Sequence, residues 1–135
     1  MNKNSLKRVY LACPMTEYHK DIYEMMVAFV KEKYPKHKHL FPEELYSNNR
    51  DFKKRFRNEV SSCSDFVFFT DSYDCIGWGV YEELETFKGV GGTPLLIERK
   101  SIPYRITDLF TLYKTNLSLT RYALVVPREG CVSYA

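Results

Sequence analysis

Short apolar runs alternate along this chain with segments whose apolar residues recur at the spacing of an amphipathic helix. The apolar runs are interpreted as buried strands and lie at residues 9–14, 65–69 and 95–97, and residues 37–41 form a weaker strand pattern that ends at Pro42. The helical segments lie at residues 22–30, 52–60 and 80–87. Such alternation favours a parallel sheet with right-handed crossovers and helices on both faces. The sequence therefore predicts an α/β protein, a three-layer flavodoxin-like (Rossmann-like) sandwich with a mostly parallel sheet of about five strands.

Two further elements are predicted after residue 97. Residues 101–114 begin around Pro103, which is a common residue at a helix start. They then carry apolar residues at helical spacing, namely Ile106, Leu109, Phe110 and Tyr113. This pattern predicts a helix, and the apolar run at residues 122–126 predicts one more strand. No repeat or linker interrupts the chain, so residues 1–135 are expected to form a single domain.

Composition and charge exclude several classes of function. The net charge of +3 is too small to demand a nucleic-acid partner, and none is expected. The N-terminus lacks the apolar core of a signal peptide, and no apolar run reaches membrane-spanning length, so a cytoplasmic protein without membrane contact is predicted. The four cysteines are far apart and the three histidines lack metal-ligand spacing. We therefore expect free thiols, no metal site and no cofactor.

A loop rich in acids and glycines follows the predicted strand at 65–69. It contains Asp71, Asp74, Gly77 and Gly79. Open α/β sheets bind their ligands beyond the carboxyl ends of the strands, so the crevice is expected between this loop and the one after the first strand. The same residues have simpler interpretations, because aspartate favours turns and helix caps and glycine permits a tight loop.

Four short motifs occur in order along residues 8–97. They are Tyr10-Leu-Ala-Cys-Pro-Met-Thr16, Leu40-Phe-Pro42-Glu-Glu-Leu45, Cys63-Ser-Asp65-Phe-Val-Phe-Phe69 and Gly79-Val-Tyr-Glu-Glu83-Leu-x-x-Phe87. Together they resemble motifs of the nucleoside 2-deoxyribosyltransferase superfamily. The last motif resembles the signature that carries the catalytic glutamate of that family.

The resemblance implies cleavage or transfer at the N-glycosidic bond of a nucleoside or nucleotide, a small-molecule substrate. It implies a homo-oligomer, since relatives complete their pockets across a subunit interface. It places Cys13, Pro14 and Met15 beside the sugar and gives Tyr10 the task of orienting the nucleophile, although strand alternation also fits Tyr10 as a core residue. The family's aspartate on the second helix has no counterpart here, and Glu59 is the nearest carboxylate.

Two adjacent glutamates compete for the role of nucleophile. The family glutamate is followed, one and four residues later, by buried positions. From Glu83 these positions are Leu84 and Phe87, which are apolar; from Glu82 they are Glu83 and Thr86, which would bury a carboxylate at substantial cost. We therefore predict Glu83 as the nucleophile, at the edge of the buried stripe, because a fixed carboxylate stabilises an oxocarbenium-like transition state.

A second group must protonate the leaving base, and three acids are candidates. These are Asp71, Asp74 and Glu59, of which Asp71 is best placed at the strand tip. Hydrolysis is favoured over transfer because no feature specifies a site for a second base. The alternative function is a non-catalytic nucleotide-binding or sensing module on the same fold. The basic run at 50–57 is interpreted as a solvated face, with contact to a nucleotide phosphate as its alternative.

Overall fold

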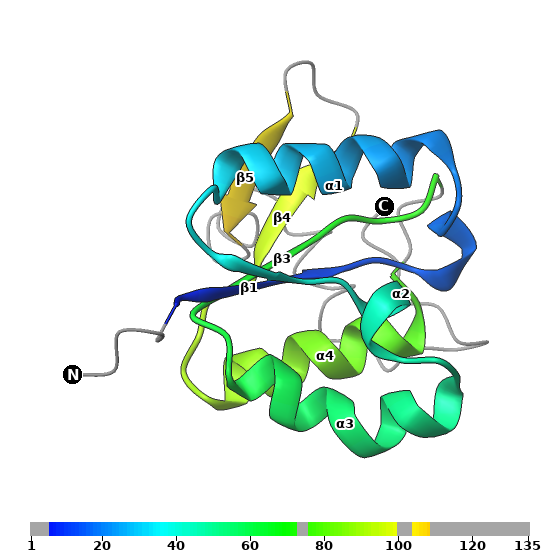
Figure 1. Ribbon diagram of the computed structural model, residues 1–135, viewed down its shortest axis with the longest axis vertical. Helices are drawn as coiled ribbons and strands as arrows, with labels where there is room; N and C mark the ends of the chain where they lie inside the picture. The colour runs from blue at the N-terminus through cyan, green and yellow to red at the C-terminus, as the bar shows by residue number, and fades with distance from the viewer. Residues whose placement is uncertain (1–5, 73–75, 100–103, 109–135) are drawn as a thin grey trace, which may run out of the picture.

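The protein is a three-layer sandwich in which one sheet lies between two layers of helices (Figure 1). The computed structural model describes residues 6–72, 76–99 and 104–108. Five strands form the sheet: β1 (Arg8–Ala12), β2 (Lys38–Leu40), β3 (Asp65–Phe68), β4 (Leu95–Glu98) and β5 (Arg105–Asp108). The predicted fold class is confirmed.

The strand order is β2-β1-β3-β4-β5, and the first four strands are parallel. The chain moves from β1 to β2 in one direction and then returns to place β3 on the other side of β1. This reversal makes the gap beyond the carboxyl ends of β1 and β3 the topological switch point, where open α/β sheets bind ligands.

Strand β5 overturns one prediction. It pairs antiparallel with β4, with Ile97 opposite Ile106, so the helix predicted over residues 101–114 is wrong for residues 105–108. Pairing with the exposed edge of β4 satisfies backbone groups that a short helix would leave open, and Ile106 packs against the core on the same face as Ile97. Residues 109–114 and the strand predicted at 122–126 lie outside the described residues.

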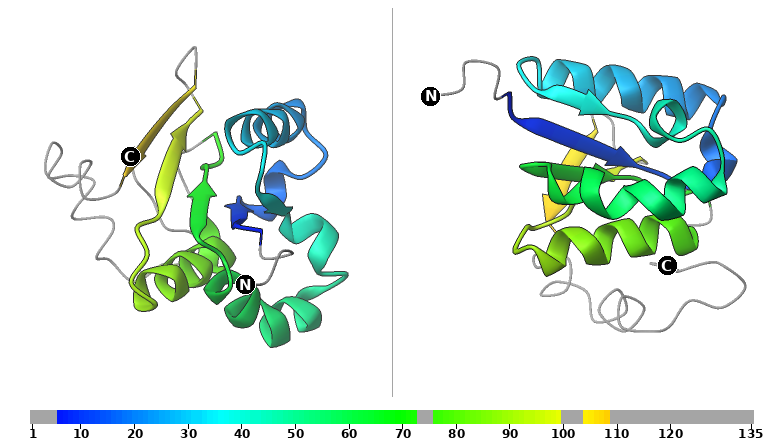
Figure 2. Two further views of the ribbon diagram at one scale, coloured as in Figure 1. Left: turned by 60° about the vertical axis from the view of Figure 1, so that its left-hand side comes forward. Right: turned by 60° about the horizontal axis from the view of Figure 1, so that its bottom comes forward.

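The helices cover both faces of the sheet (Figure 2). They are the 3₁₀ turn η1 (Met15–Glu17), α1 (Asp21–Lys33), α2 (Pro42–Leu45), α3 (Asn49–Ser61) and α4 (Gly77–Gly89). Helix α1 lies on one face, whereas α3 and α4 pack side by side on the other. Within the described residues, no helix is long and apolar enough to cross a membrane.

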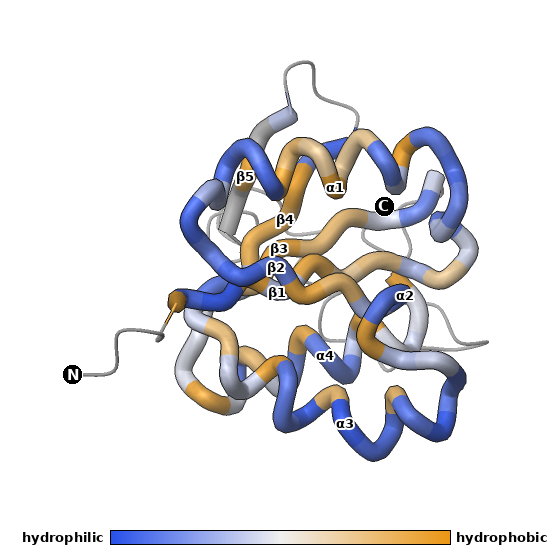
Figure 3. The backbone as a smooth tube through the Cα atoms, in the orientation of Figure 1, coloured by the Kyte–Doolittle hydropathy of each residue, from blue (hydrophilic) through white to orange (hydrophobic). Residues whose placement is uncertain are grey.

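Two apolar clusters make the core, one on each face of the sheet, because successive strand residues point to opposite sides. Val9 and Leu11 of β1 pack towards α1, whereas Tyr10 and Ala12 pack towards α3 and α4. Most of β1, β3 and β4 is correspondingly hydrophobic, whereas β2 and most of α3 are hydrophilic (Figure 3). Tyr10 is therefore a core residue that faces the helix carrying Glu83.

Candidate functional site

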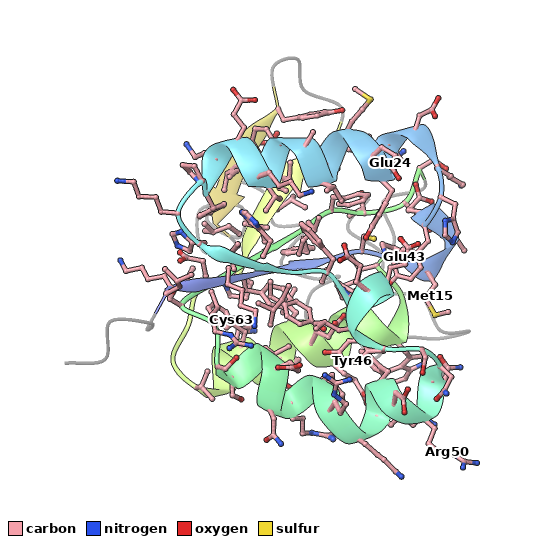
Figure 4. All side chains as sticks on the ribbon, viewed as in Figure 1. Met15, Glu24, Glu43, Tyr46, Arg50 and Cys63 are labelled. Carbon is pink, nitrogen blue, oxygen red and sulfur yellow. The ribbon has the colours of Figure 1, made fainter. Side chains whose placement is uncertain are left out.

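A cleft of about 1010 Å³ opens at the carboxyl edge of the sheet. Its walls come from three segments: the loop and 3₁₀ turn after β1, the stretch from α2 into the first turns of α3, and the chain from the end of β3 into the first turns of α4. In Figure 4, Met15, Glu43 and Tyr46 lie at this end of the sheet, whereas Cys63 lies at the opposite end. The cleft thus lies where the topology of the sheet predicts a ligand site.

Glu83 lines the cleft from helix α4 but is only 3% exposed. It belongs to the buried stripe of that helix, together with Val80, Leu84 and Phe87. Helical spacing puts Glu83 at one edge of this stripe, facing the cleft as expected, but the side chain is as deeply buried as the apolar residues beside it. A carboxylate can be buried here because a buried hydrogen-bond donor satisfies it.

Tyr10 is that donor. Its hydroxyl donates to Oε2 of Glu83 across the interface between β1 and α4, and its ring stacks on Phe66 with centroids 5.5 Å apart. Burial raises the pKa of Glu83 to about 8, and the hydrogen bond from Tyr10 opposes that rise. Burial, followed by the nearby Glu83 carboxylate, raises the pKa of Tyr10 far above its ordinary value, so Tyr10 stays neutral.

Tyr46 extends the contact. Its hydroxyl lies 2.9 Å from the hydroxyl of Tyr10, and the residue itself lines the cleft just after α2. Burial also raises the pKa of Tyr46 above its ordinary value. Glu83, Tyr10 and Tyr46 therefore form a chain of hydroxyl and carboxyl groups, and its two outer members, Glu83 and Tyr46, both line the cleft.

Most of the residues predicted from the sequence do come together at this cleft. Its lining includes Cys13, Pro14, Met15, Asp71, Gly77 and Gly79. Gly77 begins α4 with a φ of 74°, a backbone conformation that other residues rarely adopt. Asp74 lies outside the described residues.

Glu59 does not join this group. Helix α3 runs opposite to the strands, so its last turns lie towards the amino edge of the sheet, outside the lining of the cleft. There the Glu59 carboxylate pairs with Arg8 at 3.4 Å and with Arg55 at 2.9 Å. The prediction that Glu59 binds substrate is not supported by this position, since the residue is absent from the cleft lining.

Sequence reasoning missed several residues that line the cleft, above all Glu43 and Tyr46. Both follow β2, which lies beside β1 in the sheet. The rule that placed the site beyond the ends of the first and third strands applies equally to this neighbour, so it could have found them. Glu82 also lines the cleft, one residue before Glu83.

The basic run on α3 contributes one residue to the lining, Lys53. Arg50 points outward (Figure 4), and Arg55 donates to the backbone carbonyl of Leu45 at 2.8 Å in addition to its pair with Glu59. Most of this run is thus a solvated face, as the sequence indicates.

A second buried glutamate, Glu17 of η1, is 2% exposed and lies between two residues that line the cleft, Thr16 and Tyr18. Arg99 donates to its Oε1 at 2.9 Å and also to the Thr70 carbonyl at 2.7 Å, while Lys20 lies 3.2 Å from Oε2. Burial raises the pKa of Glu17, but the hydrogen bonds from Arg99 and Lys20 outweigh it and leave the pKa below its ordinary value. This cluster ties the loop after β1 to the end of β3, two walls of the cleft.

The described lining of the cleft offers carboxyl and hydroxyl groups. Among the described residues, no group of three or more histidine, cysteine or acidic side chains could hold a metal ion. Cys13 and Cys63 are buried free thiols. Burial, followed by the nearby Glu83 and Glu17 carboxylates, raises the pKa of Cys13, which opposes formation of a thiolate.

Comparisons with protein-family models, with curated proteins and with solved structures find no match to this chain. The case for a function therefore rests on the geometry of the cleft and on the motifs that line it.

Proposed function

We propose that the chain is an enzyme that cleaves or transfers the N-glycosidic bond of a nucleoside or nucleotide, with Glu83 as the nucleophile. One observation carries the proposal: a buried carboxyl group lines the cleft, is hydrogen-bonded by Tyr10, and forms no ion pair with any described residue. Burial without a compensating cation is costly for folding, so it favours a functional role for this carboxyl group.

The chemistry follows from the charge that develops on the sugar. As the C1–N bond lengthens, positive charge builds on the sugar ring, and an uncompensated carboxylate in a low-dielectric site stabilises it strongly. The bonding electrons leave with the base, and a Glu83 oxygen bonds to C1 to form a glycosyl ester. Water or a second base then attacks C1 and releases the carboxylate.

A general acid must give the departing base a proton and recover one from the incoming water or base. We assign this role to Asp71, which lines the cleft beyond the end of β3. Glu43 and Glu82 line the same cleft and are the competing acids. Isosteric substitutions, Asp71→Asn against Glu43→Gln and Glu82→Gln, separate the three, because loss of the acid slows substrates with poor leaving groups most.

One observation favours a second candidate, a non-catalytic nucleotide-binding module. With a pKa of about 8, Glu83 is only about one tenth ionised at pH 7. A neutral carboxyl group both donates and accepts hydrogen bonds, which suits recognition of a base edge. In this reading Glu83 binds the ligand without bonding to it.

A turnover assay with a panel of deoxynucleosides, deoxynucleotides and NAD separates the two functions. The enzyme predicts release of free base, a loss of at least about 1000-fold in Glu83→Gln, and an intact-protein mass increased by one glycosyl group after rapid acid quench. Exposed Glu85→Gln on the same helix is the matched control. Tight binding of a nucleotide without any base release would overturn the enzyme, and full activity in Glu83→Gln would overturn the residue assignment.

A further inference from the structure

We propose that Tyr46 is a positioning residue for Glu83. Its hydroxyl donates a hydrogen bond to the Tyr10 hydroxyl, which keeps the Tyr10 proton directed at the Glu83 carboxylate. It also provides a second hydrogen-bonded route from that carboxyl group to the cleft. The inference rests on the proposed function only in its choice of Glu83 as the reacting group. The contacts that carry it are the Tyr10–Glu83 hydrogen bond and the 2.9 Å separation of the two tyrosine hydroxyl oxygens.

The direction of the chain follows from counting protons. A tyrosine hydroxyl has one proton to donate, and Tyr10 gives its proton to Oε2 of Glu83. In the contact between the two hydroxyls, Tyr46 must then be the donor and Tyr10 the acceptor. Both hydroxyls therefore point towards the carboxylate, and each hydrogen bond polarises the next.

The same chain can run in reverse when Glu83 is protonated. The Glu83 O–H then donates to Tyr10, Tyr10 to Tyr46, and Tyr46 to a water molecule or a ligand nitrogen in the cleft. If each proton moves one bond along, Glu83 becomes a carboxylate, both tyrosines end neutral, and the water or nitrogen gains the proton. A ligand that covers the 3% exposed face of Glu83 would leave this route open, because Tyr46 also lines the cleft.

Packing fixes the Tyr46 ring in the orientation that this chain requires. The ring meets the Phe52 ring edge-on with centroids 5.4 Å apart, and the guanidinium of Arg55 lies 5.7 Å from its centroid. Its backbone N–H donates to the Pro42 carbonyl at 3.0 Å. A buried aromatic ring held on several sides positions its hydroxyl at little entropic cost.

The charged and titratable groups around this chain come from several elements. They are Cys13 after β1, Tyr18 after η1, Glu43 on α2, Glu82 on α4, and Arg55 and Glu59 on α3. Cys13 and Tyr18 are neutral because burial raises the pKa of each, and Arg55 is paired with Glu59. The two tyrosines are thus the described groups that contact Glu83 directly or through one hydrogen bond.

The test is a direct titration of Glu83, which needs no turnover. The protonated carboxyl stretch in infrared spectra, assigned by its loss in Glu83→Gln, gives the midpoint. We expect Tyr46→Phe to raise the midpoint by about half a pH unit and Tyr10→Phe to raise it by about one unit or more. The double variant should match Tyr10→Phe alone, because Tyr46 acts through Tyr10.

Tyr18→Phe is the matched control, since Tyr18 also lines the cleft but has no part in the chain, and its midpoint should equal that of the wild type. An unchanged midpoint in Tyr46→Phe, or a shift that adds to that of Tyr10→Phe, would overturn the proposal. The wild-type protein offers a test without any variant. Assigned hydroxyl protons of Tyr10 and Tyr46 should show a nuclear Overhauser contact, and its absence would also overturn the chain. Lack of turnover would leave these results standing, so the two proposals fail separately.

Discussion

The protein buries two glutamates near one cleft and gives their carboxyl groups different partners. Glu17 is 2% exposed and Glu83 is 3% exposed, so solvent does not distinguish them. Glu17 is surrounded by Arg99 and Lys20, whereas Glu83 has a tyrosine hydroxyl and forms no ion pair with the described residues. Accordingly the pKa of Glu17 is lowered and that of Glu83 is raised to about 8.

Because of these different partners, the Glu17 carboxyl group supports the fold, whereas the Glu83 carboxyl group is available for chemistry. The charge of Glu17 is neutralised by its partners, so it stabilises the walls of the cleft and has little left to offer a ligand. When Glu83 is ionised it has no cationic partner among the described residues, so it is available to stabilise a positive charge that develops in the cleft. Burial alone does not identify a functional carboxylate; burial together with the identity of the partner does.

The largest expected effect comes from removing the cation beside Glu17. Arg99→Met leaves a buried carboxylate without its main partner, and we expect the free energy of unfolding to fall by about 3–5 kcal/mol. Urea denaturation at pH 7 measures this change. The matched control is Lys88→Met, which removes an exposed pair with Glu85 and should cost less than about 0.5 kcal/mol. Equal costs for the two variants would contradict the structural role of Glu17.

The next effect concerns stability against pH, for which the two glutamates have opposite signs. The folded pKa of Glu83 lies above its ordinary value of 4.5, so the unfolded chain loses this proton first and the stability of the fold falls as pH rises from about 4.5 to about 8. Glu83→Gln removes that penalty, and we expect it to gain up to about 4 kcal/mol relative to wild type between those limits. Denaturation at pH 5 and pH 8 measures the gain. Glu17→Gln should instead lose stability above pH 4.5, because the pKa of Glu17 is lowered on folding. If the free energy of unfolding, relative to wild type, changed with pH in the same direction in both variants, the proposed difference between the two glutamates would be wrong.

The position of the cleft could be predicted from the sequence. The different partners of Glu17 and Glu83 could not. Cys13, Met15, Asp71 and Gly77 each follow a strand that alternation alone identifies, so topology brings them to one edge of the sheet. Helical periodicity also put Glu83 on α4, but it could not reveal that a tyrosine hydroxyl satisfies the buried carboxyl group. That contact joins residues 73 positions apart.

The same limit explains the other errors. Residues 105–108 have an apolar spacing that fits a helix, and only the open edge of β4 makes them a strand. Glu59 is the carboxylate nearest in sequence to the place of the family's aspartate, but the direction of α3 carries it to the opposite edge of the sheet. In each case the deciding partner is remote in sequence, and local patterns do not report it.

A smaller effect tests the hydrogen bond that distinguishes Glu83. The nucleophile acts as a carboxylate, so kcat/KM should rise with pH up to about 8. The Tyr10 hydrogen bond favours the ionised form, and Tyr10→Phe should move this rise to higher pH by about one unit. Steady-state kinetics across pH 5–10 measures the shift. Tyr34 lies outside the cleft lining, so Tyr34→Phe should leave the pH profile of kcat/KM unchanged. If the Tyr10→Phe profile matched that of the wild type, the proposed effect of Tyr10 on Glu83 would be wrong.

The smallest effect concerns Lys53, the one cation among the described residues that line the cleft. Because its side chain is exposed, solvent screens its charge from Glu83, and Lys53→Gln should leave the titration midpoint of Glu83 unchanged. The same variant should raise KM about fivefold for a phosphorylated substrate and leave KM for the matching nucleoside unaltered, since one exposed cation contributes about 1 kcal/mol to binding a phosphate. Lys54→Gln, one residue along α3 and outside the lining, is the control. A midpoint that rises in Lys53→Gln would mean that Lys53 acts as a cationic partner of Glu83. Both glutamates would then have a cationic partner, and they would differ only in how far away that partner lies.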